Sequence, residues 1–118
     1  MKRVYVCGSF KFMNKIEELV ALLQAEGAEF LVSKGLDARG ILGCLEKVDR
    51  ADIVYVVDPE GYVGKSVSVD LGYAYARNKL IYVMHPVSDP PIMNMICGVL
   101  SFEELVDLVK GGHSIRGL

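Results

Sequence analysis

The stretch Ile53-Val54-Tyr55-Val56-Val57 is an unbroken apolar run, rich in β-branched residues, that stands between Asp52 and the pair Asp58-Pro59. A strand covered by helices on both faces has this continuous pattern, whereas a strand with one face in water alternates apolar and polar residues. Aspartate and proline are typical of the boundaries of strands. The run therefore predicts the central strand of a parallel sheet.

Shorter apolar runs and longer amphipathic stretches alternate on both sides of this strand. The other predicted strands are Arg3–Cys7, Ala28–Val32, Leu80–Met84 and a short strand near Val99, and the predicted helices are Lys11–Glu26, Ile41–Arg50, about Ser66–Asn78 and about Phe102–Lys110. Such alternation, with right-handed crossovers, is typical of a doubly wound α/β fold. We therefore expect one three-layer, Rossmann-like domain over residues 1–118, with a five-stranded parallel sheet in the order 2-1-3-4-5. Residues 33–40 are predicted to form a loop, His85–Ile92 an irregular segment rich in proline, and 111–118 a loose tail.

The composition limits the kind of molecule. The 118 residues are 52% hydrophobic and 24% charged, with a formal net charge of -2, which is the profile of one compact domain. The N-terminal apolar run is too short for a signal peptide, and no run approaches the ~20 apolar residues of a membrane span. A near-neutral charge balance gives no general attraction to duplex nucleic acid, but it allows a small anionic ligand. We therefore expect a cytoplasmic protein without a membrane segment.

The cysteines, Cys7, Cys44 and Cys97, are odd in number, and no two of them form a C-x-x-C pair. A chain of this length buries enough surface to fold without disulfides. The pattern therefore favours free, buried thiols over disulfides or a zinc site, and no metal site is predicted.

Two loops follow the carboxyl ends of neighbouring predicted strands. In a sheet with the order 2-1-3-4-5, ligands bind outside the carboxyl ends of the first and third strands, where the strand order reverses. These ends lead into residues 8–14 and 58–70. The topology alone therefore nominates both loops as the ligand site.

The first loop, Gly8-Ser9-Phe10-Lys11, places a permissive backbone, a hydroxyl and a cation at the start of a predicted helix. Free N–H groups and the helix dipole attract anions at such an end, so a phosphate or a carboxylate fits there. An equally open interpretation is that Ser9 caps the helix and that Lys11 is a solvated helix residue.

The second loop runs from Asp58 through Gly64-Lys65-Ser66 to Asp70. It is not a phosphate-binding P-loop, because that motif requires a glycine where this chain has Pro59. The small residues Gly64, Ser66 and Ser68 allow a ligand to approach the backbone closely, next to Asp70 in the first two turns of the predicted helix. A catalytic carboxylate is one interpretation of Asp70, and an acidic residue favoured there by the helix dipole is the other.

Residues 52–79, DIVYVVDPEGYVGKSVSVDLGYAYARNK, resemble the signature of the nucleoside 2-deoxyribosyltransferase-like family. That family has an alanine-aspartate pair before the central strand, a glycine-rich loop, and then a glutamate followed by an apolar residue, glycine, an aromatic residue or Arg, and alanine. The segment Tyr5-Val6-Cys7-Gly8-Ser9 is similar to the first strand and phosphate loop of the branch that hydrolyses deoxynucleoside 5′-monophosphates. The resemblance covers most of residues 3–84.

The resemblance implies a flavodoxin-like fold and, without a cofactor, N-glycosidic bond cleavage or base transfer on 2′-deoxynucleosides or their 5′-monophosphates. It implies that Asp70 attacks C1′ of the deoxyribose and that Tyr5 steers it or contacts the sugar, with the logic of a retaining glycosidase. It also places Ser9, Ser66 and Ser68 at the 5′ end of the ligand. The predicted substrate-binding set is Gly8, Ser9, Phe10, Lys11, Asp58, Gly64, Ser66 and Ser68. Because family members often complete the site with a neighbouring subunit, a homo-oligomer is implied as well.

Two residues differ from the family pattern. The family nucleophile is typically glutamate, and the side chain of Asp70 is shorter by one methylene group, or about 1.5 Å. The family also has an acidic residue or histidine where this chain has Cys44, and Asp37, Glu46 and Asp49 are candidate substitutes. These differences favour a second hypothesis, a non-catalytic nucleotide-binding or sensing domain. A third, a receiver-like or flavodoxin-like signalling or redox domain, is weakest, because the first strand does not end in an acidic pair.

Overall fold

The computed structural model describes residues 2–32 and 40–111. Its strands are β1 (Val4–Gly8), β2 (Phe30–Val32), β3 (Ile53–Val57), β4 (Leu80–Val83) and β5 (Gly98–Val99). Its helices are α1 (Met13–Ala25), α2 (Ile41–Arg50), α3 (Lys65–Ala76), α4 (Pro90–Met93) and α5 (Phe102–Lys110), with the 3₁₀ turns η1 (Phe10–Phe12) and η2 (Pro59–Gly61). Every predicted strand and helix is present, with small shifts at the ends.

The strands form one parallel sheet in the order β2-β1-β3-β4-β5. β3 lies in the middle of this order and pairs with β1 on one side and β4 on the other. Each residue of β3 is buried, as its continuous apolar run predicts. The molecule has an α/β flavodoxin-like fold, and the predicted order of the strands is confirmed.

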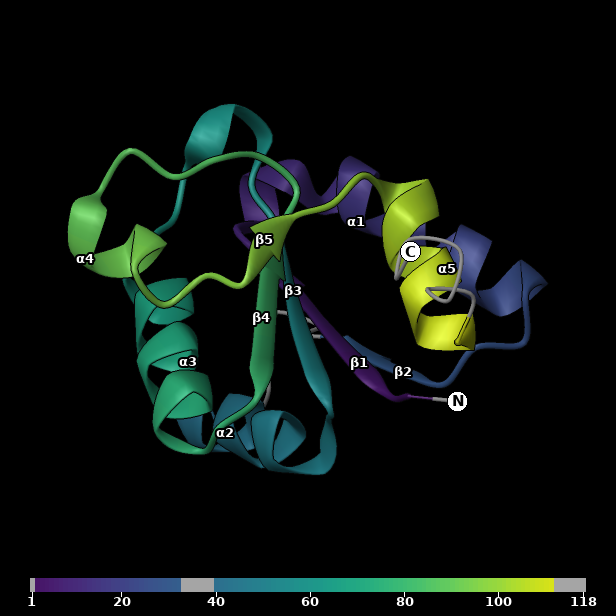
Figure 1. The fold of residues 1–118 in the computed structure, drawn as a ribbon, viewed down its shortest axis with the longest axis horizontal. Coiled ribbons are helices and arrows are strands. Elements are labelled where there is room, and N and C mark those ends of the chain that lie inside the picture. Colours follow the sequence, from purple (N-terminus) through teal and green to yellow (C-terminus); the bar gives the residue numbers. More distant parts are fainter. Residues whose placement is uncertain (1, 33–39, 112–118) are drawn as a thin grey trace.

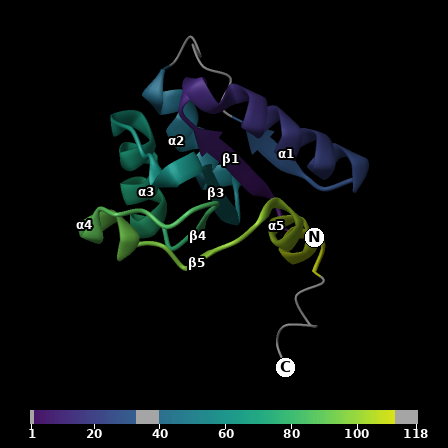
Figure 2. The same ribbon diagram turned by 90° about the horizontal axis from the view of Figure 1, so that it is seen from above.

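Helices cover both faces of the sheet, with α1 and α5 on one face and α2 and α3 on the other (Figures 1 and 2). Successive residues of a strand point to opposite faces. Val4 and Val6 of β1 therefore pack on the α1 and α5 side, and Tyr5 and Cys7 pack on the α2 and α3 side. Among the described residues, no helix is long and apolar enough to cross a membrane.

The helix predicted to start at Lys11 begins two residues later, at Met13. The turn η1 precedes it, and Ser9 caps this turn by accepting a hydrogen bond from the backbone N–H of Lys11 (3.4 Å). The interpretation of Ser9 as a cap is therefore confirmed, although it caps a 3₁₀ turn rather than the α-helix itself.

The segment His85–Ile92, predicted to be irregular, leads into the short helix α4. Asp89 caps this helix by accepting a hydrogen bond from the backbone N–H of Ile92 (3.3 Å). Pro90 occupies the first helical position, where the missing N–H of proline leaves no helical hydrogen bond unmade. The prolines therefore start this helix instead of preventing it.

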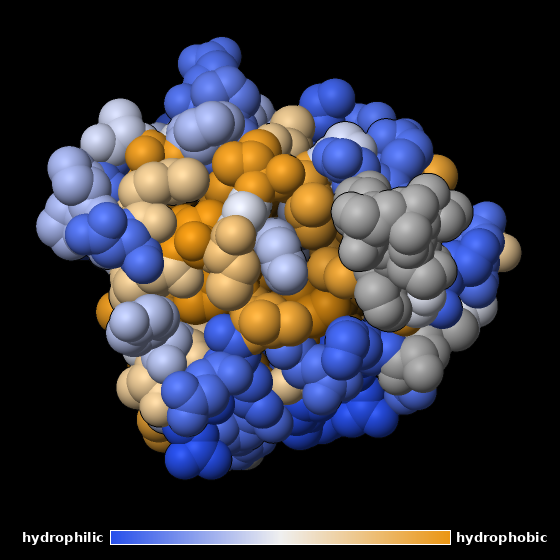
Figure 3. Space-filling view, in the orientation of Figure 1, coloured by the Kyte–Doolittle hydropathy of each residue, from blue (hydrophilic) through white to orange (hydrophobic). Residues whose placement is uncertain are grey.

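The three cysteines are free thiols, and Cys7 is buried as predicted. Cys97 is exposed, so the expectation of a buried thiol is wrong there, because this residue directly precedes the edge strand β5. The same edge leaves Val99 42% exposed. Figure 3 has the orientation of Figure 1, in which β5 lies in front. Apolar surface gathers in the middle of this face.

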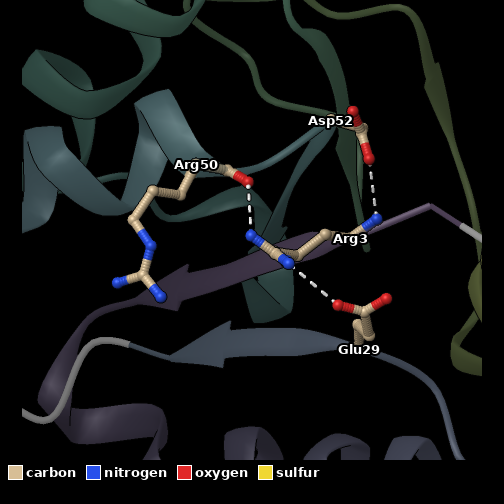
Figure 4. A network of polar contacts seen from close by, with 4 residues as sticks. All are labelled: Arg3, Glu29, Arg50 and Asp52. Atoms are coloured by element: carbon tan, nitrogen blue, oxygen red, sulfur yellow. Dashed lines mark hydrogen bonds and ion pairs between the residues drawn. The ribbon is translucent and has the colours of Figure 1, made fainter.

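A polar network joins three strands at their amino ends (Figure 4). The backbone N–H of Arg3 donates to Oδ2 of Asp52 (2.8 Å), and the Arg3 guanidinium donates to Oε2 of Glu29 (2.9 Å) and to the carbonyl oxygen of Arg50 (3.4 Å). Arg3, Glu29 and Asp52 directly precede β1, β2 and β3. The network therefore lies at the opposite end of the sheet from the predicted ligand loops.

Candidate functional site

A cavity of about 580 Å³ lies at the carboxyl end of β1, between the first turns of α2 and of α3. The predicted site residues that line it are Gly8, Ser9, Phe10, Gly64, Ser66 and Asp70. Gly8 ends β1, Ser9 and Phe10 follow it, and the other three belong to the loop after β3 and to α3. The two loops nominated by the topology therefore meet at one cavity.

Asp70 is a buried carboxylate in the wall of this cavity, with 3% of its surface exposed. It lies on α3 next to the buried residues Val67 and Leu71, so it is on the helix face that packs against the sheet. Its Oδ2 accepts a hydrogen bond from the hydroxyl of Tyr5 (3.4 Å). Its Oδ1 is buried and has no hydrogen-bond partner within the described part of the chain.

Burial changes the acidity of both side chains in this pair. It raises the pKa of Asp70 from 3.8 to about 6, although the Tyr5 hydroxyl bond and the charge of Lys47 act in the opposite direction. Burial also raises the pKa of Tyr5 well above its ordinary value, and Cys7 and Asp70 add to this effect. At neutral pH the carboxyl is therefore mostly ionised, while Tyr5 stays protonated and its hydroxyl donates a hydrogen bond to Oδ2.

Cys44 of α2 lines the cavity and adjoins the Tyr5 hydroxyl. Of the candidate substitutes for an acid at this position, Glu46 is exposed. Asp49 is bound at the far end of α2, where its Oδ1 pairs with Nε of Arg77 (3.0 Å). Asp37 lies outside the described residues. Asp70 is therefore the only carboxylate that lines the cavity in residues 2–32 and 40–111.

Three predicted substrate-binding residues lie outside the cavity lining and hold other contacts. Nζ of Lys11 lies 3.7 Å from the centroid of the Tyr62 ring. The hydroxyl of Ser68 donates to the carbonyl oxygen of Gly64 (2.8 Å), one helical turn earlier. Asp58 is fully buried at the end of β3, so its carboxylate does not reach the cavity surface.

The carboxylate of Asp58 is bound to the chain segment after β4. Its Oδ1 accepts hydrogen bonds from the backbone N–H groups of Met84 (3.0 Å) and His85 (2.9 Å), and its Oδ2 is buried without a partner among the described residues. Burial raises the pKa of Asp58 to about 6, although these backbone bonds lower it. Asp58 therefore fixes the carboxyl ends of β3 and β4 to each other.

Several residues that line the cavity were not predicted from the sequence, among them Cys7, Ile41, Lys65 and Tyr62. Only Tyr62 carries a signal in the sequence, because a large aromatic residue stands out in a loop of small residues between Asp58 and Asp70. The others enter the cavity through the path of the backbone.

The arrangement supplies a carboxylate that accepts a hydrogen bond at Oδ2 and has no hydrogen-bond partner at Oδ1 among the described residues. Tyr5 holds Oδ2, and most of the residues that line the cavity are apolar or small. The start of α3 adds an anion-binding end, because its N-cap is Gly64, which has no side chain to satisfy the first N–H groups. Among the described residues, no group of three or more potential metal-ligating side chains lies together.

No protein-family model and no curated protein matches the chain. A conserved protein from Enterococcus faecalis V583 is similar in structure, with a TM-score of 0.68 and 15% identity over 95% of this chain and 99% of that chain. The Clostridium botulinum CMP N-glycosidase BcmB has a TM-score of 0.60 and 14% identity over 92% of this chain and 98% of its own. The Vibrio vulnificus NanR protein, in a complex with ManNAc-6P, has a TM-score of 0.67 and 15% identity over 98% of this chain and 49% of that chain. At these identities, the likeness shows the fold.

Proposed function

We propose that this protein cleaves the N-glycosidic bond of a 2′-deoxynucleoside or its 5′-monophosphate, with Asp70 as the nucleophile. The observation that carries this proposal is the state of Asp70: a carboxylate in the cavity wall, oriented by Tyr5, with Oδ1 free of hydrogen bonds to the described residues. The resemblance of residues 52–79 to the deoxyribosyltransferase-like family supports the same chemistry. An N-glycosidase among the solved structures with this fold supports it as well.

The reaction follows from the two oxygens of Asp70. Oδ1 forms a bond to C1′ while the bond from C1′ to the base nitrogen breaks, and the base leaves with the electron pair and takes a proton from water. A water molecule then attacks C1′, releases the sugar and restores the carboxylate, as in retaining glycosidases. Tyr5 keeps Oδ2 in place through both steps, so it is a positioning residue in this scheme.

A 5′-phosphate fits the start of α3. The first N–H groups of this helix have no side-chain cap, and Ser9 and Ser66 line the same cavity. The positive end of the helix dipole and the charge of Lys65 favour an anion there. We therefore place the 5′ end of the substrate against the start of α3, and the sugar between it and Asp70.

The test is a chromatographic assay for free base, with each 2′-deoxynucleoside and each 5′-monophosphate as substrate. We expect base release by the wild-type protein and a loss of roughly a hundredfold or more in Asp70→Asn, which keeps the shape of the side chain but not its charge. Tyr75→Phe, at an exposed position of α3 outside the cavity lining, is the matched control. Release of no base from any of these substrates by the wild-type protein would contradict the proposal.

A non-catalytic nucleotide-binding or sensing domain is the second candidate. It is favoured by the absence, among the described lining residues, of a second carboxyl group to protonate the leaving base. In that case a nucleotide raises the melting temperature of the wild-type protein while no base is released, and Asp70→Glu, with the longer side chain, gains activity.

Two further predictions concern the protein as a whole. Assembly into a homo-oligomer stays a prediction, which sedimentation velocity tests directly. The cytoplasmic location stays a prediction too, and fractionation of the host cell tests it.

A further inference from the structure

Tyr62 stands between the cavity in front of Asp70 and a second cavity of about 400 Å³. Besides Tyr62, the second cavity is lined by residues of the loop after β3, such as Glu60, and of the segment before and within α4, such as Val87 and Ile92. Within the described part of the chain, Tyr62 is the one residue that lines both cavities. Tyr62 therefore borders both spaces.

Contacts from the loop after β1 hold the Tyr62 ring in this place. Nζ of Lys11 lies 3.7 Å from the ring centroid, and the ring of Phe12 meets it edge-on with the centroids 5.9 Å apart. The ring also lies against Gly64 at the start of α3, where a Cβ atom would be 3.4 Å from the Tyr62 hydroxyl. Although Tyr62 is 45% exposed, it therefore has packed neighbours on more than one side.

The backbone that presents Tyr62 is strained and closely fixed. Glu60 has φ 63° and ψ 12°, which is an uncommon conformation for a residue with a side chain, and Gly61 has φ 81°. A Cβ atom at Gly61 would lie 2.4 Å from the carbonyl oxygen of Pro86, so only glycine fits. The carboxylate of Asp58 binds the same chain segment through the N–H of His85. Strain that the surroundings enforce is a reason to look for a function at the residue it positions.

We propose that Tyr62 is the specificity-determining residue of the substrate cavity and limits its ligand to the size of a mononucleotide. This rests on the proposed function, which places the 5′-phosphate against the start of α3, where the Tyr62 ring lies. A group attached beyond that phosphate, such as the second nucleoside of a dinucleotide, meets the ring. Without the ring, the two cavities become one groove that holds such a ligand.

Calorimetric titration of the Asp70→Asn protein, which removes turnover, tests this limit. The ligands are the four 2′-deoxynucleoside 5′-monophosphates and the four matching homodinucleotides. We expect the mononucleotide to bind at least about tenfold more tightly than its dinucleotide, and Tyr62→Ala to bind the dinucleotide about tenfold more tightly than the parent does. Tyr62→Leu is expected to be intermediate, Tyr62→Phe to match the parent, and Tyr75→Ala, outside both cavities, to change nothing. Dinucleotide affinity that is equal in Tyr62→Ala and the parent would overturn the proposal.

A second measurement needs no nucleotide and uses Cys44, which lines the first cavity. In a Cys97→Ser background, which removes the exposed thiol, mass spectrometry follows labelling of Cys44 by iodoacetamide and by the bulkier fluorescein maleimide. Tyr62→Ala is expected to accelerate the maleimide about tenfold and iodoacetamide less than twofold. If the maleimide accelerates but no nucleotide binds, the size limit stands and the proposed function fails. If base is released but neither labelling nor dinucleotide binding changes, the Tyr62 proposal fails alone.

Discussion

Asp58 and Asp70 are two buried carboxylates that have the same raised pKa of about 6 and different hydrogen-bond partners. Oδ1 of Asp58 accepts hydrogen bonds from two backbone N–H groups, so it fixes one chain segment to another. Oδ2 of Asp70 accepts a hydrogen bond from the hydroxyl of Tyr5, and Asp70 lines the cavity. The two carboxylates therefore differ in their hydrogen-bond partners and in whether they line the cavity, not in burial.

The pH dependence of base release is a prediction at this scale. Asp70 must be ionised to attack, and burial raises its pKa to about 6. We therefore expect kcat/KM to rise about tenfold per pH unit below pH 6 and to become level above it. The measurement is a pH profile of base release from pH 4.5 to 8. A profile that is level down to pH 4.5 would show that Asp70 is not the group that must lose a proton.

The same carboxylate is predicted to reduce stability. A carboxyl whose pKa is higher in the folded state binds more protons there than in the unfolded state, so stability falls as pH rises from about 4 to 6 and is then constant. Asp70→Asn removes the buried charge and is expected to raise the free energy of unfolding at pH 8 by up to about 3 kcal/mol. Little gain is expected at pH 4, where Asp70 is protonated.

Urea denaturation at both pH values measures this difference. Glu17→Gln, on the exposed side of α1, is the matched control, with no change expected beyond about 0.5 kcal/mol at either pH. A destabilised Asp70→Asn protein at pH 8 would contradict the prediction.

At the scale of the elements, two glycines test the loop and the helix that build the site. Gly61→Ala places a Cβ atom 2.4 Å from the carbonyl oxygen of Pro86 at φ 81°, so we expect a loss of about 2 kcal/mol or more in the free energy of unfolding. Gly72→Ala, on the exposed side of α3 with no atom within 4 Å of the new Cβ, is expected to gain about 1 kcal/mol. Equal effects of the two substitutions in thermal or urea denaturation would show that the loop is not held against Pro86.

The strands and helices were predictable because each follows from a local pattern of apolar and polar residues in the sequence. β3 is an unbroken apolar run, and the order of the sheet follows from the alternation of strands with helices. The pairing of the two loops at one cavity follows from that order as well. The capping of α5 is likewise local, because Ser101 and Glu104, three residues apart, accept hydrogen bonds from each other's backbone N–H groups.

The contacts inside the site were not predictable from local patterns. Nζ of Lys11 lies over the ring of Tyr62, which is far from Lys11 in the sequence. The turn η1 directs the side chain of Lys11 toward the loop after β3. The hydroxyl of Ser68 donates a hydrogen bond to the carbonyl oxygen of Gly64, and the sequence does not show in which direction that hydroxyl points. The contact between Lys11 and Tyr62 depends on the path of the backbone before Tyr62, which includes the positive φ of Glu60.

In the molecule as a whole, the Arg3 network lies at the amino ends of the strands and the cavity lies at their carboxyl ends. Asp52→Ala removes the acceptor for the N–H of Arg3 at the amino ends, and we expect it to lower the free energy of unfolding by about 1 kcal/mol. The cavity lies at the carboxyl ends, so nucleotide affinity is expected to stay within about twofold of the wild-type value. Urea denaturation and calorimetric titration measure the two quantities. An affinity that falls together with stability would show that the two ends are coupled.

The position of the Arg3 network has a consequence for how such a chain acquires new specificities. The cross-links between strands that hold β1, β2 and β3 in register stand at the end where no ligand is expected. Loop positions at the other end, apart from Asp58 and Gly61, can therefore change without loosening the register of these three strands. A combinatorial library confined to residues 9–10, 62 and 65–66 is a compact starting point for directed evolution on this scaffold.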